Sequence, residues 1–344
     1  MKNRSVCILG ATGVLGQEYL RLLSEHPYLK IRSVCGRKNV GKKLSECIDG
    51  ADGTSKLPAS LLELEILPSE PKAIDAELVF SPLPNEEALL LEPKFASAGL
   101  CVVTDAAPHR LDQTVPLLVP EVNPESIGRL DRRHAGGAEG FIVATPNCTA
   151  TGMVLTLKPL EKFGIKNVVA TTMQAVSGAG YPGVPSLDII DNVIPHIPSE
   201  EEKIDMEINK ILSRTDSPIR FSVTATRVPV LNGHTVSMHV EFEQVCDVED
   251  VRQSVVNFRG RPQELGLPTA PKIPLVLFDE TDRPQPRFDR ECGSVPGMAV
   301  AIGRLRRGLN DRAVHYVEVS NNKVRGGAGG AVLAAELLCA EGVV

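Results

Sequence analysis

The sequence lacks any cysteine pattern that is typical of a metal site. Its eight cysteines include no C-x-x-C pair, and no cluster of cysteine and histidine has the spacing of zinc ligands. This absence excludes the common zinc modules, and we expect no bound metal. Disulfides are not expected either, because the chain is long and shows no export signal. Most cysteines should be small buried side chains, as we expect for Cys7 and Cys101 in strand-like runs.

Long apolar runs and an excess of positive charge are missing as well. The first residues lead directly into a strand-like run that ends in glycines, and no stretch approaches about 18 apolar residues. The sequence therefore predicts neither a signal peptide nor a membrane-spanning helix, and we expect a cytoplasmic protein. The net charge of −6 gives no general attraction to nucleic acid or to an anionic membrane, although a local basic pocket for a phosphate remains open.

The 344 residues suffice for two domains, and the first part of the chain alternates strand-like with helix-like segments. Strands are predicted at residues 5–9, 30–36, 76–82, 100–107 and 140–146. The helices expected between them include residues 17–27 and 85–99. This alternation predicts an α/β fold with a parallel, doubly wound sheet.

The character of the chain changes after Cys148. A helix-like segment is followed by longer strand-like runs at residues 167–177, 220–231, 234–244 and 313–322, with a charged helix at 200–213. Long strands in close succession predict an α+β domain with an antiparallel or mixed sheet. Residues 281–297, rich in proline and arginine, predict an exposed loop, and a glycine-rich turn opens a last helix.

A glycine turn between the first strand and the first helix predicts a dinucleotide site. Gly10, Gly13 and Gly16 have G-x-x-G-x-x-G spacing, which permits a tight turn and brings backbone and helix N-terminus close to a pyrophosphate. The second strand lacks the terminal carboxylate that favours NAD; Ser33, Arg37 and Lys38 are found there instead. Two cations suit the 2′-phosphate of NADP, and the alternative is that they are solvated loop charges.

Cys148 follows a predicted strand and precedes a predicted helix. A thiolate at a helix N-terminus has a lowered pKa, which suits a nucleophile, although a lone cysteine there can also be structural. A nucleophile needs a base within reach, and His234 begins a strand directly after an Asn-Gly turn, a position that can point into a cleft. Residues 174–183 form a glycine-rich segment that predicts either a ligand-binding loop or an ordinary surface loop.

Eight segments carry a wider resemblance: GATGVLGQ, DAAPHR, VPLLVPEVNP, PNCTATG, MQAVSGAGYPG, SEEEKIDMEINKIL, RVPVLNGHT and VRGGAGGAVLAAELL. In this order, along nearly the whole chain, they resemble the aspartate-β-semialdehyde dehydrogenase family, in particular its archaeal and fungal branch. Two departures are Thr145, where the family often has Asn, and Thr149, where the fungal branch often has Ser. Both residues are small and polar, so the backbone around Cys148 can keep its role.

The resemblance implies a role for each matching residue. Cys148 is the implied nucleophile, His234 the general acid/base, and Gln174 the residue that positions the acyl-enzyme. The implied substrate-binding residues are Arg227 for the α-carboxylate, Glu207 for the ammonium group, and Arg110 and Asn147 with Lys210 for the phosphate. Glu200, Glu201 and Glu202 compete with Glu207 for its role. The implied NADP-binding residues are Gly10, Thr12, Gly13, Val14, Ser33, Arg37, Lys38, Ser81, Ser177, Gly178 and Asn322.

The resemblance also implies an architecture. We expect a Rossmann-type domain that binds NADP (1–147), an α+β catalytic and dimerisation domain with a mixed sheet (148–324), and a C-terminal helix (325–344) that packs back on the first domain. Cys148 is expected in the cleft where cofactor and substrate meet. A homodimer or homotetramer is implied.

The implied reaction is the NADP-dependent conversion of L-aspartyl-4-phosphate to L-aspartate-4-semialdehyde through a Cys148 thioester, within the biosynthesis of lysine, diaminopimelate, methionine, threonine and isoleucine. Reductases of malonyl-CoA or N-acetylglutamyl phosphate share the cysteine, histidine and glycine loop, so they remain alternatives. A glyceraldehyde-phosphate-type dehydrogenase fits fewer of the motifs. A non-enzymatic sensor that kept the fold and binds NADP is the remaining alternative.

Overall fold

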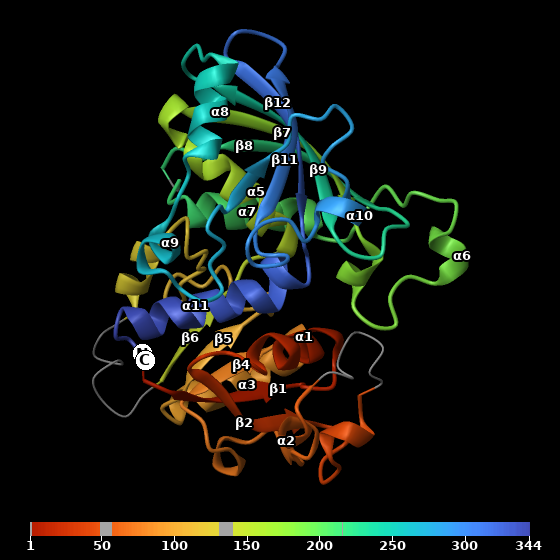
Figure 1. Ribbon diagram of the computed structural model, residues 1–344, viewed down its shortest axis with the longest axis vertical. Coiled ribbons are helices and arrows are strands. Elements are labelled where there is room, and N and C mark those ends of the chain that lie inside the picture. Colours follow the sequence, from red (N-terminus) through yellow and green to blue (C-terminus); the bar gives the residue numbers. More distant parts are fainter. Residues whose placement is uncertain (1, 49–56, 131–139, 215) are drawn as a thin grey trace. The chain divides into compact units, whose positions relative to one another are not determined.

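A computed structural model describes residues 2–48, 57–130, 140–214 and 216–344 (Figure 1). The chain divides into two compact units. Unit 1 contains residues 1–118, 124–146 and 327–344, and unit 2 contains residues 119–123 and 147–326. In the described part of the chain, no helix is long and apolar enough to cross a membrane.

Unit 1 is built on a six-stranded parallel sheet with the strand order β3-β2-β1-β4-β5-β6. The strands are β1 (Arg4–Leu9), β2 (Leu29–Gly36), β3 (Ile66–Pro68), β4 (Leu78–Ser81), β5 (Cys101–Thr104) and β6 (Phe141–Ala144). The central strand β1 ends in Val-Cys-Ile-Leu, all fully buried, because helices cover both faces of a parallel sheet.

The helices of unit 1 are α1 (Val14–Leu23), α2 (Ala59–Leu62), α3 (Asn85–Ser97) and α11 (Gly329–Ala340), with short 3₁₀ turns at Leu44–Glu46, Pro71–Ala73 and Pro124–Arg129. The C-terminal helix α11 belongs to this unit and packs on β5 and α1. Its first two turns are almost entirely small or aliphatic residues, which lets it lie buried in the core.

Unit 2 is built on a mixed sheet with the strand order β10-β11-β12-β9-β7-β8. The strands are β7 (Ile165–Gln174), β8 (Arg220–Arg227), β9 (His234–Phe242), β10 (Leu275–Leu277), β11 (Val300–Arg307) and β12 (Ala313–Ser320). The pairs β7–β8 and β10–β11 are parallel, and the other three are antiparallel. Burial alternates along β9, so one sheet face is packed and the other is half-exposed.

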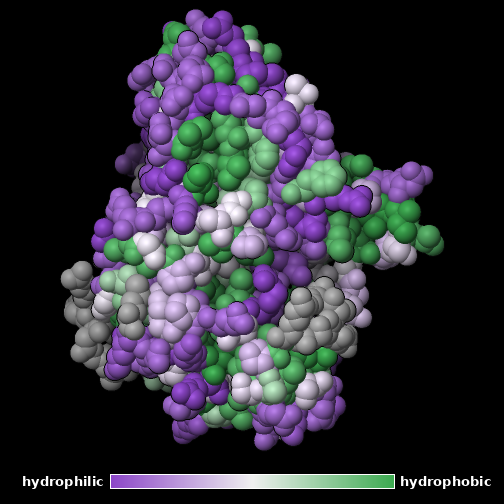
Figure 2. Space-filling view, viewed as in Figure 1, coloured by the Kyte–Doolittle hydropathy of each residue, from purple (hydrophilic) through white to green (hydrophobic). Residues whose placement is uncertain are grey.

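The packed face of this sheet is covered by helices (Figure 1). The helices of unit 2 are α5 (Cys148–Leu157), α6 (Ser186–Ile189), α7 (Glu200–Ile211), α8 (Val248–Val256), α9 (Arg261–Leu265) and α10 (Pro286–Asp289). Shorter helical turns occur at Lys158–Phe163, Val176–Ala179 and Val324–Ala328. α6 lies on an arm of unit 2 whose surface is largely hydrophobic, as Figure 2 shows. The exposed apolar residues of this arm are Tyr181, Leu187, Ile190 and Val193.

The predicted fold class is confirmed: a parallel Rossmann-like sheet, a second mixed sheet, and a C-terminal helix that returns to the first unit. The prediction that residues 281–297 form only a loop is wrong in one detail, because α10 lies within them. Strand β11 was not predicted, because Gly303 weakens its strand pattern. A Cβ there would lie 2.5 Å from the carbonyl oxygen of Arg283, so only glycine permits this close backbone approach.

Glu318 in β12 is a fully buried carboxyl behind α5. The hydroxyl of Thr156 donates to its Oε2 at 2.8 Å, and Gly152 makes room for its Oε1. Burial raises the pKa of Glu318 to about 8, so the folded protein holds this group protonated at neutral pH. In the unfolded chain it ionises near its ordinary value, so stability is lost as pH rises from about 4.5 to 8.

We expect Glu318→Gln to flatten this pH dependence, because glutamine cannot ionise. Between pH 5 and pH 8 the wild-type free energy of unfolding should fall by roughly 3 kcal/mol more than that of the variant. Urea unfolding of both proteins at the two pH values measures the difference, and other titrating groups cancel. Equal changes in the two proteins would show that Glu318 is ionised when folded.

Candidate active site

Cys148 is the first residue of α5, and Asn147 caps this helix. The Asn147 Oδ1 accepts hydrogen bonds from the backbone N–H of Thr149 at 2.8 Å and Ala150 at 3.1 Å. The cap starts the helix immediately after Pro146, which fixes the half-buried Cys148 sulfur at the positive end of the helix dipole.

His234 faces this sulfur. Its Nε2 lies 3.1 Å from Cys148 Sγ, and the imidazole is fully buried at the first position of β9. The preceding Gly233 has φ = +96°, a left-handed conformation that glycine adopts without strain and that completes the Asn-Gly turn. The turn and the strand therefore aim the ring at the thiol.

The contacts of His234 also indicate which of its ring nitrogens carries the proton. The backbone N–H of Ala175 donates to His234 Nδ1 at 3.1 Å, so Nδ1 carries no proton. Burial, and then the charge of Arg227, lower the pKa of His234 to about 3, which keeps the ring neutral at neutral pH. A neutral ring without a proton on Nδ1 carries it on Nε2. This N–H is the donor that faces Cys148 Sγ.

Arg227 and Gln174 are paired at the ends of neighbouring parallel strands β8 and β7. Both are buried, and an Arg227 Nη1 donates to the carbonyl oxygen of Ala175 at 2.8 Å. Burial lowers the pKa of Arg227, and nearby Cys148 and Glu200 oppose that shift. The guanidinium therefore lies in the electrostatic range of the thiol, where a substrate carboxylate would need a partner.

The glycine-rich loop after β7 closes over these side chains. A Cβ on Gly178 would lie 2.8 Å from Arg227 Nη1 and 3.0 Å from His234 Cε1. Asn322 ties this loop to the histidine turn, because its Nδ2 donates to Ser177 Oγ and its Oδ1 accepts from Gly233 N–H, both at 2.9 Å. Ser177, Gly178 and Asn322 are thus brought together beside the Cys148–His234 pair.

Helix α7 supplies two buried carboxylates to the same place. Glu207 Oε2 accepts the backbone N–H of Asn147 at 2.6 Å. Glu200 accepts the Asn147 side-chain amide at 3.0 Å and the Gln174 side-chain amide at 2.8 Å. The Asn147 amide is therefore occupied at both ends, by its own helix and by Glu200. Lys210 lies half-buried on the same helix.

In unit 1 the predicted glycine turn fits a dinucleotide phosphate. Gly10 has φ = +61°, and a Cβ on Gly16 would lie 2.3 Å from the Gly10 carbonyl oxygen, so the turn needs both glycines. Gly13 caps α1 without a side-chain hydrogen bond, and no acidic residue occupies the first turn. Thr12 and Val14 flank this cap. A helix N-terminus that has no side-chain cap and lies in a tight glycine turn is suited to bind an anion.

Four other predicted cofactor residues lie elsewhere in unit 1. The Ser33 hydroxyl is buried within β2 and accepts the backbone N–H of Asp75 at 3.2 Å. The buried Ser81 hydroxyl donates to Glu92 at 2.6 Å. The structure therefore uses both hydroxyls inside the unit, at positions where the sequence predicts cofactor contacts. Arg37 and Lys38 are exposed after β2.

Arg110 also belongs to unit 1. It is buried and donates to the carbonyl oxygen of Asp105 at 2.6 Å. This hydrogen bond holds the guanidinium just beyond β5, in the stretch DAAPHR, where the family resemblance implies that Arg110 binds phosphate.

Family models match both parts of the chain. Residues 5–130 match the semialdehyde dehydrogenase NAD binding domain, and residues 157–325 match the semialdehyde dehydrogenase dimerisation domain. An aspartate-semialdehyde dehydrogenase of Archaeoglobus fulgidus is 42% identical over 99% of both chains. The chain belongs to the aspartate-semialdehyde dehydrogenase family.

One solved structure and one further relative extend the comparison. The aspartate-semialdehyde dehydrogenase of Candida albicans, solved with NADP, has a TM-score of 0.90 and 35% identity and covers 100% of both chains. The predicted resemblance to the archaeal and fungal members of the family is thereby confirmed. A malonyl-CoA reductase (NADP) of Metallosphaera sedula is 40% identical over 100% of this chain and 99% of its own.

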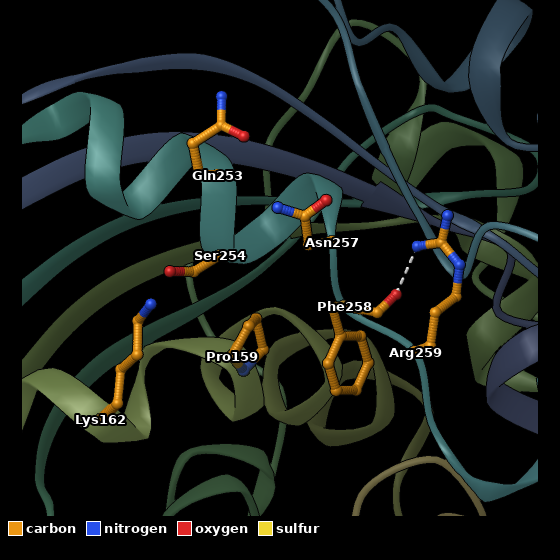
Figure 3. A pocket seen from close by; sticks show the side chains of 7 residues that line it. All are labelled: Pro159, Lys162, Gln253, Ser254, Asn257, Phe258 and Arg259. Carbon is orange, nitrogen blue, oxygen red and sulfur yellow. Dashed lines mark hydrogen bonds between the residues drawn. The ribbon is translucent and has the colours of Figure 1, made fainter.

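A separate groove of unit 2 lacks several kinds of side chain that gather around Cys148. This groove has a volume of about 370 Å³ and is shown in Figure 3. Its lining residues are Pro159, Lys162, Gln253, Ser254, Asn257, Phe258 and Arg259. They include no thiol, imidazole or carboxylate, and the Arg259 guanidinium is turned onto the Phe258 carbonyl oxygen. A thiol and an imidazole in contact are found instead at Cys148 and His234.

Proposed function

We propose that the protein reduces L-aspartyl-4-phosphate to L-aspartate-4-semialdehyde with NADPH, and catalyses the reverse reaction with phosphate and NADP. The observation that carries this proposal is the 3.1 Å contact of Cys148 Sγ with the Nε2 of His234, with Arg227 close by. The aspartate-semialdehyde dehydrogenase relatives, 35 to 42% identical over nearly their whole length, support the same reaction.

Cys148 is the proposed nucleophile. Its thiolate attacks the acyl carbon of the substrate, the C–O bond to phosphate breaks, and an aspartyl thioester remains. Arg227 binds the α-carboxylate in this proposal, because a guanidinium offers two parallel N–H donors to a carboxylate. Glu207 as partner of the ammonium group, and Arg110 with Lys210 as partners of the phosphate, remain predictions.

His234 handles the proton. The N–H groups of Thr149 and Ala150 are occupied by the Asn147 cap, so the donor that faces the reacting sulfur is His234 Nε2–H. This donor stabilises the thiolate before attack, and afterwards the substrate oxygen as it becomes negative. The neutral ring needs no proton from solvent at the start, because its proton is already held on Nε2.

NADP is the proposed cofactor, and its reduced form, NADPH, would supply the hydride for the reduction when it is bound. The N-terminus of α1, which has no side-chain cap, and the tight turn at Gly10, Gly13 and Gly16 fit its pyrophosphate. The Candida albicans relative, solved with NADP, supports this choice. Arg37 is our candidate for the 2′-phosphate. It is 81% exposed at its side chain and pairs with Glu87 at 3.0 Å, an exchangeable surface contact.

We expect Arg37→Ala to raise the KM for NADP by about tenfold and to leave the KM for NAD almost unchanged, because only NADP has a 2′-phosphate to lose. Glu87→Gln is the matched control: it frees Arg37, and the KM for NADP should stay equal or fall. Steady-state rates with both cofactors measure the effect. Equal changes in the KM values for NADP and NAD would show that Arg37 does not bind the 2′-phosphate.

A second candidate activity is the reduction of malonyl-CoA, because the Metallosphaera sedula relative with that name is 40% identical. The two activities differ in the leaving group, phosphate or coenzyme A. A steady-state assay of NADPH formation from aspartate semialdehyde, with phosphate present or absent, tests our choice. NADPH formation that depends on phosphate supports the proposed aspartate-semialdehyde dehydrogenase activity. Turnover of malonyl-CoA, with no turnover of aspartate semialdehyde, contradicts it.

We further propose that the protein acts as a cytoplasmic homodimer, or as a tetramer built from dimers, in the biosynthesis of lysine, diaminopimelate, threonine, methionine and isoleucine. Unit 2 matches a dimerisation domain, and its arm exposes Tyr181 and Leu187 by 90%. Large apolar residues that are this exposed favour a partner surface. Sedimentation of the purified protein that shows only monomers at micromolar concentration would contradict the homodimer.

A further inference from the structure

Glu200, the first residue of α7, connects three residues around the nucleophile. One of its oxygens, Oε1, accepts from the Gln174 amide at 2.8 Å, the Asn147 amide at 3.0 Å and the Thr149 hydroxyl at 3.3 Å. The other oxygen, Oε2, also accepts from the Asn147 amide at 3.0 Å. Glu200, Asn147 and Gln174 are all buried, so water does not compete for these contacts.

The carboxylate determines which way the two amides point. A side-chain amide has a donor end and an acceptor end of nearly equal shape, whereas an ionised carboxylate only accepts hydrogen bonds. Glu200 therefore holds the NH₂ groups of Asn147 and Gln174 toward itself. The oxygen of Asn147 is then directed at the first N–H groups of α5, where it caps the helix that begins at Cys148.

The neighbouring carboxylates of α7 do not have this arrangement. Glu201 accepts the backbone N–H of Ala225 at 2.9 Å and so connects α7 to β8. Glu202 is exposed. Glu207 accepts the backbone N–H of Asn147, a group that cannot turn around. Among these four carboxylates, Glu200 is the one that contacts the rotatable amides.

We propose that Glu200 is a positioning residue for catalysis, which orients the amides of Gln174 and Asn147 around Cys148. It acts through these two residues and touches neither the reacting sulfur nor His234. The α7 N-terminus favours its negative charge. This inference rests on the proposed function, because Gln174 and Asn147 matter for turnover only if Cys148 forms the acyl-enzyme.

The test compares Glu200→Gln with Glu202→Gln, which makes the same change on the exposed side of the same helix. In E200Q we expect kcat for aspartate semialdehyde oxidation to fall about tenfold or more, because a neutral amide no longer fixes the orientation of two others. The KM values for substrate and NADP should stay within about threefold. E202Q should leave kcat and both KM values unchanged. An unchanged kcat in folded E200Q would overturn the proposal.

A double-mutant cycle separates positioning from general stability. Because Glu200 acts through Gln174 and Asn147, E200Q should cost a clearly smaller factor in a Gln174→Ala background, where one of the two amides is already gone, than in the wild-type background. A merely structural Glu200 would cost the same factor in both backgrounds, and that result would overturn the proposal. Thermal unfolding of each variant shows whether activity and stability fall together.

A measurement on the wild-type protein remains decisive if the variants do not fold or if no turnover is found. In ¹⁵N-labelled protein, NMR follows how fast the side-chain NH₂ protons exchange with solvent. The NH₂ protons of Asn147 and Gln174 should exchange far more slowly than those of the exposed Gln253. Exchange as fast as that of Gln253 would overturn the role of Glu200. Slow exchange together with no turnover on aspartate semialdehyde would be consistent with the hydrogen bonds of both amides to Glu200 and would contradict the proposed function alone.

Discussion

Replacement of Cys148 by alanine is expected to abolish turnover, with a loss in kcat of at least about 10⁴-fold. The thiol is the atom that forms the covalent intermediate in our account, and alanine leaves no group that can take its place. Its sulfur lies at the start of α5 and faces His234 at 3.1 Å. NADP binding, measured by calorimetry, should persist, because the glycine turn of unit 1 is untouched.

Cys292→Ala is the matched control for this variant. Cys292 is also half-buried, but burial raises the pKa of its thiol to about 11, so it should be inert at neutral pH. We expect its variant to retain full activity. Rapid alkylation of the wild-type protein should modify Cys148 first. Substantial turnover by the Cys148→Ala variant would refute the assignment of the nucleophile.

Replacement of His234 by asparagine should lower kcat by about 10²- to 10⁴-fold, the usual range for loss of a positioned acid or base. Asparagine can still accept the N–H of Ala175, but it is too short to present a donor to Cys148 Sγ. The rate of Cys148 alkylation should fall too, because the Nε2–H that stabilises the thiolate is lost.

His239→Asn serves as the control for the histidine variant. His239 lies on the same strand β9 but on its half-exposed face, away from Cys148. Its replacement should leave kcat unchanged. Because the pKa of His234 is lowered to about 3, the ring does not titrate between pH 5 and pH 8 in the free protein. A wild-type kcat/KM that follows a single group of pKa near 6.5, lost in His234→Asn, would contradict the neutral-imidazole account.

The sequence predicted the elements that depend on local order. A helix was predicted directly after Cys148, although the cap that Asn147 provides was not, and the Asn-Gly turn before His234 indicates where a strand begins. The alternation of strands and helices likewise predicted the parallel sheet of unit 1. In each of these cases residues a few positions apart determine the structure.

Contacts between distant residues were not predictable in this way. Glu200 reaches Asn147 across 53 positions and Gln174 across 26, and nothing near Glu200 in the sequence separates it from Glu201 and Glu202. The buried Ser33 and Ser81 hydroxyls are taken by Asp75 and Glu92, which only the packed strands bring close. The sequence shows which groups are present, whereas packing decides which partner each one binds.

The most direct test of the account is to trap the acyl-enzyme. The protein is mixed with aspartate semialdehyde and NADP in the absence of phosphate, quenched in acid and digested for mass spectrometry. We predict that the peptide containing Cys148 gains the mass of one aspartyl group, and that added phosphate removes this label with release of aspartyl phosphate. A Cys148 peptide that stays unmodified while NADPH is formed would contradict covalent catalysis by this thiol.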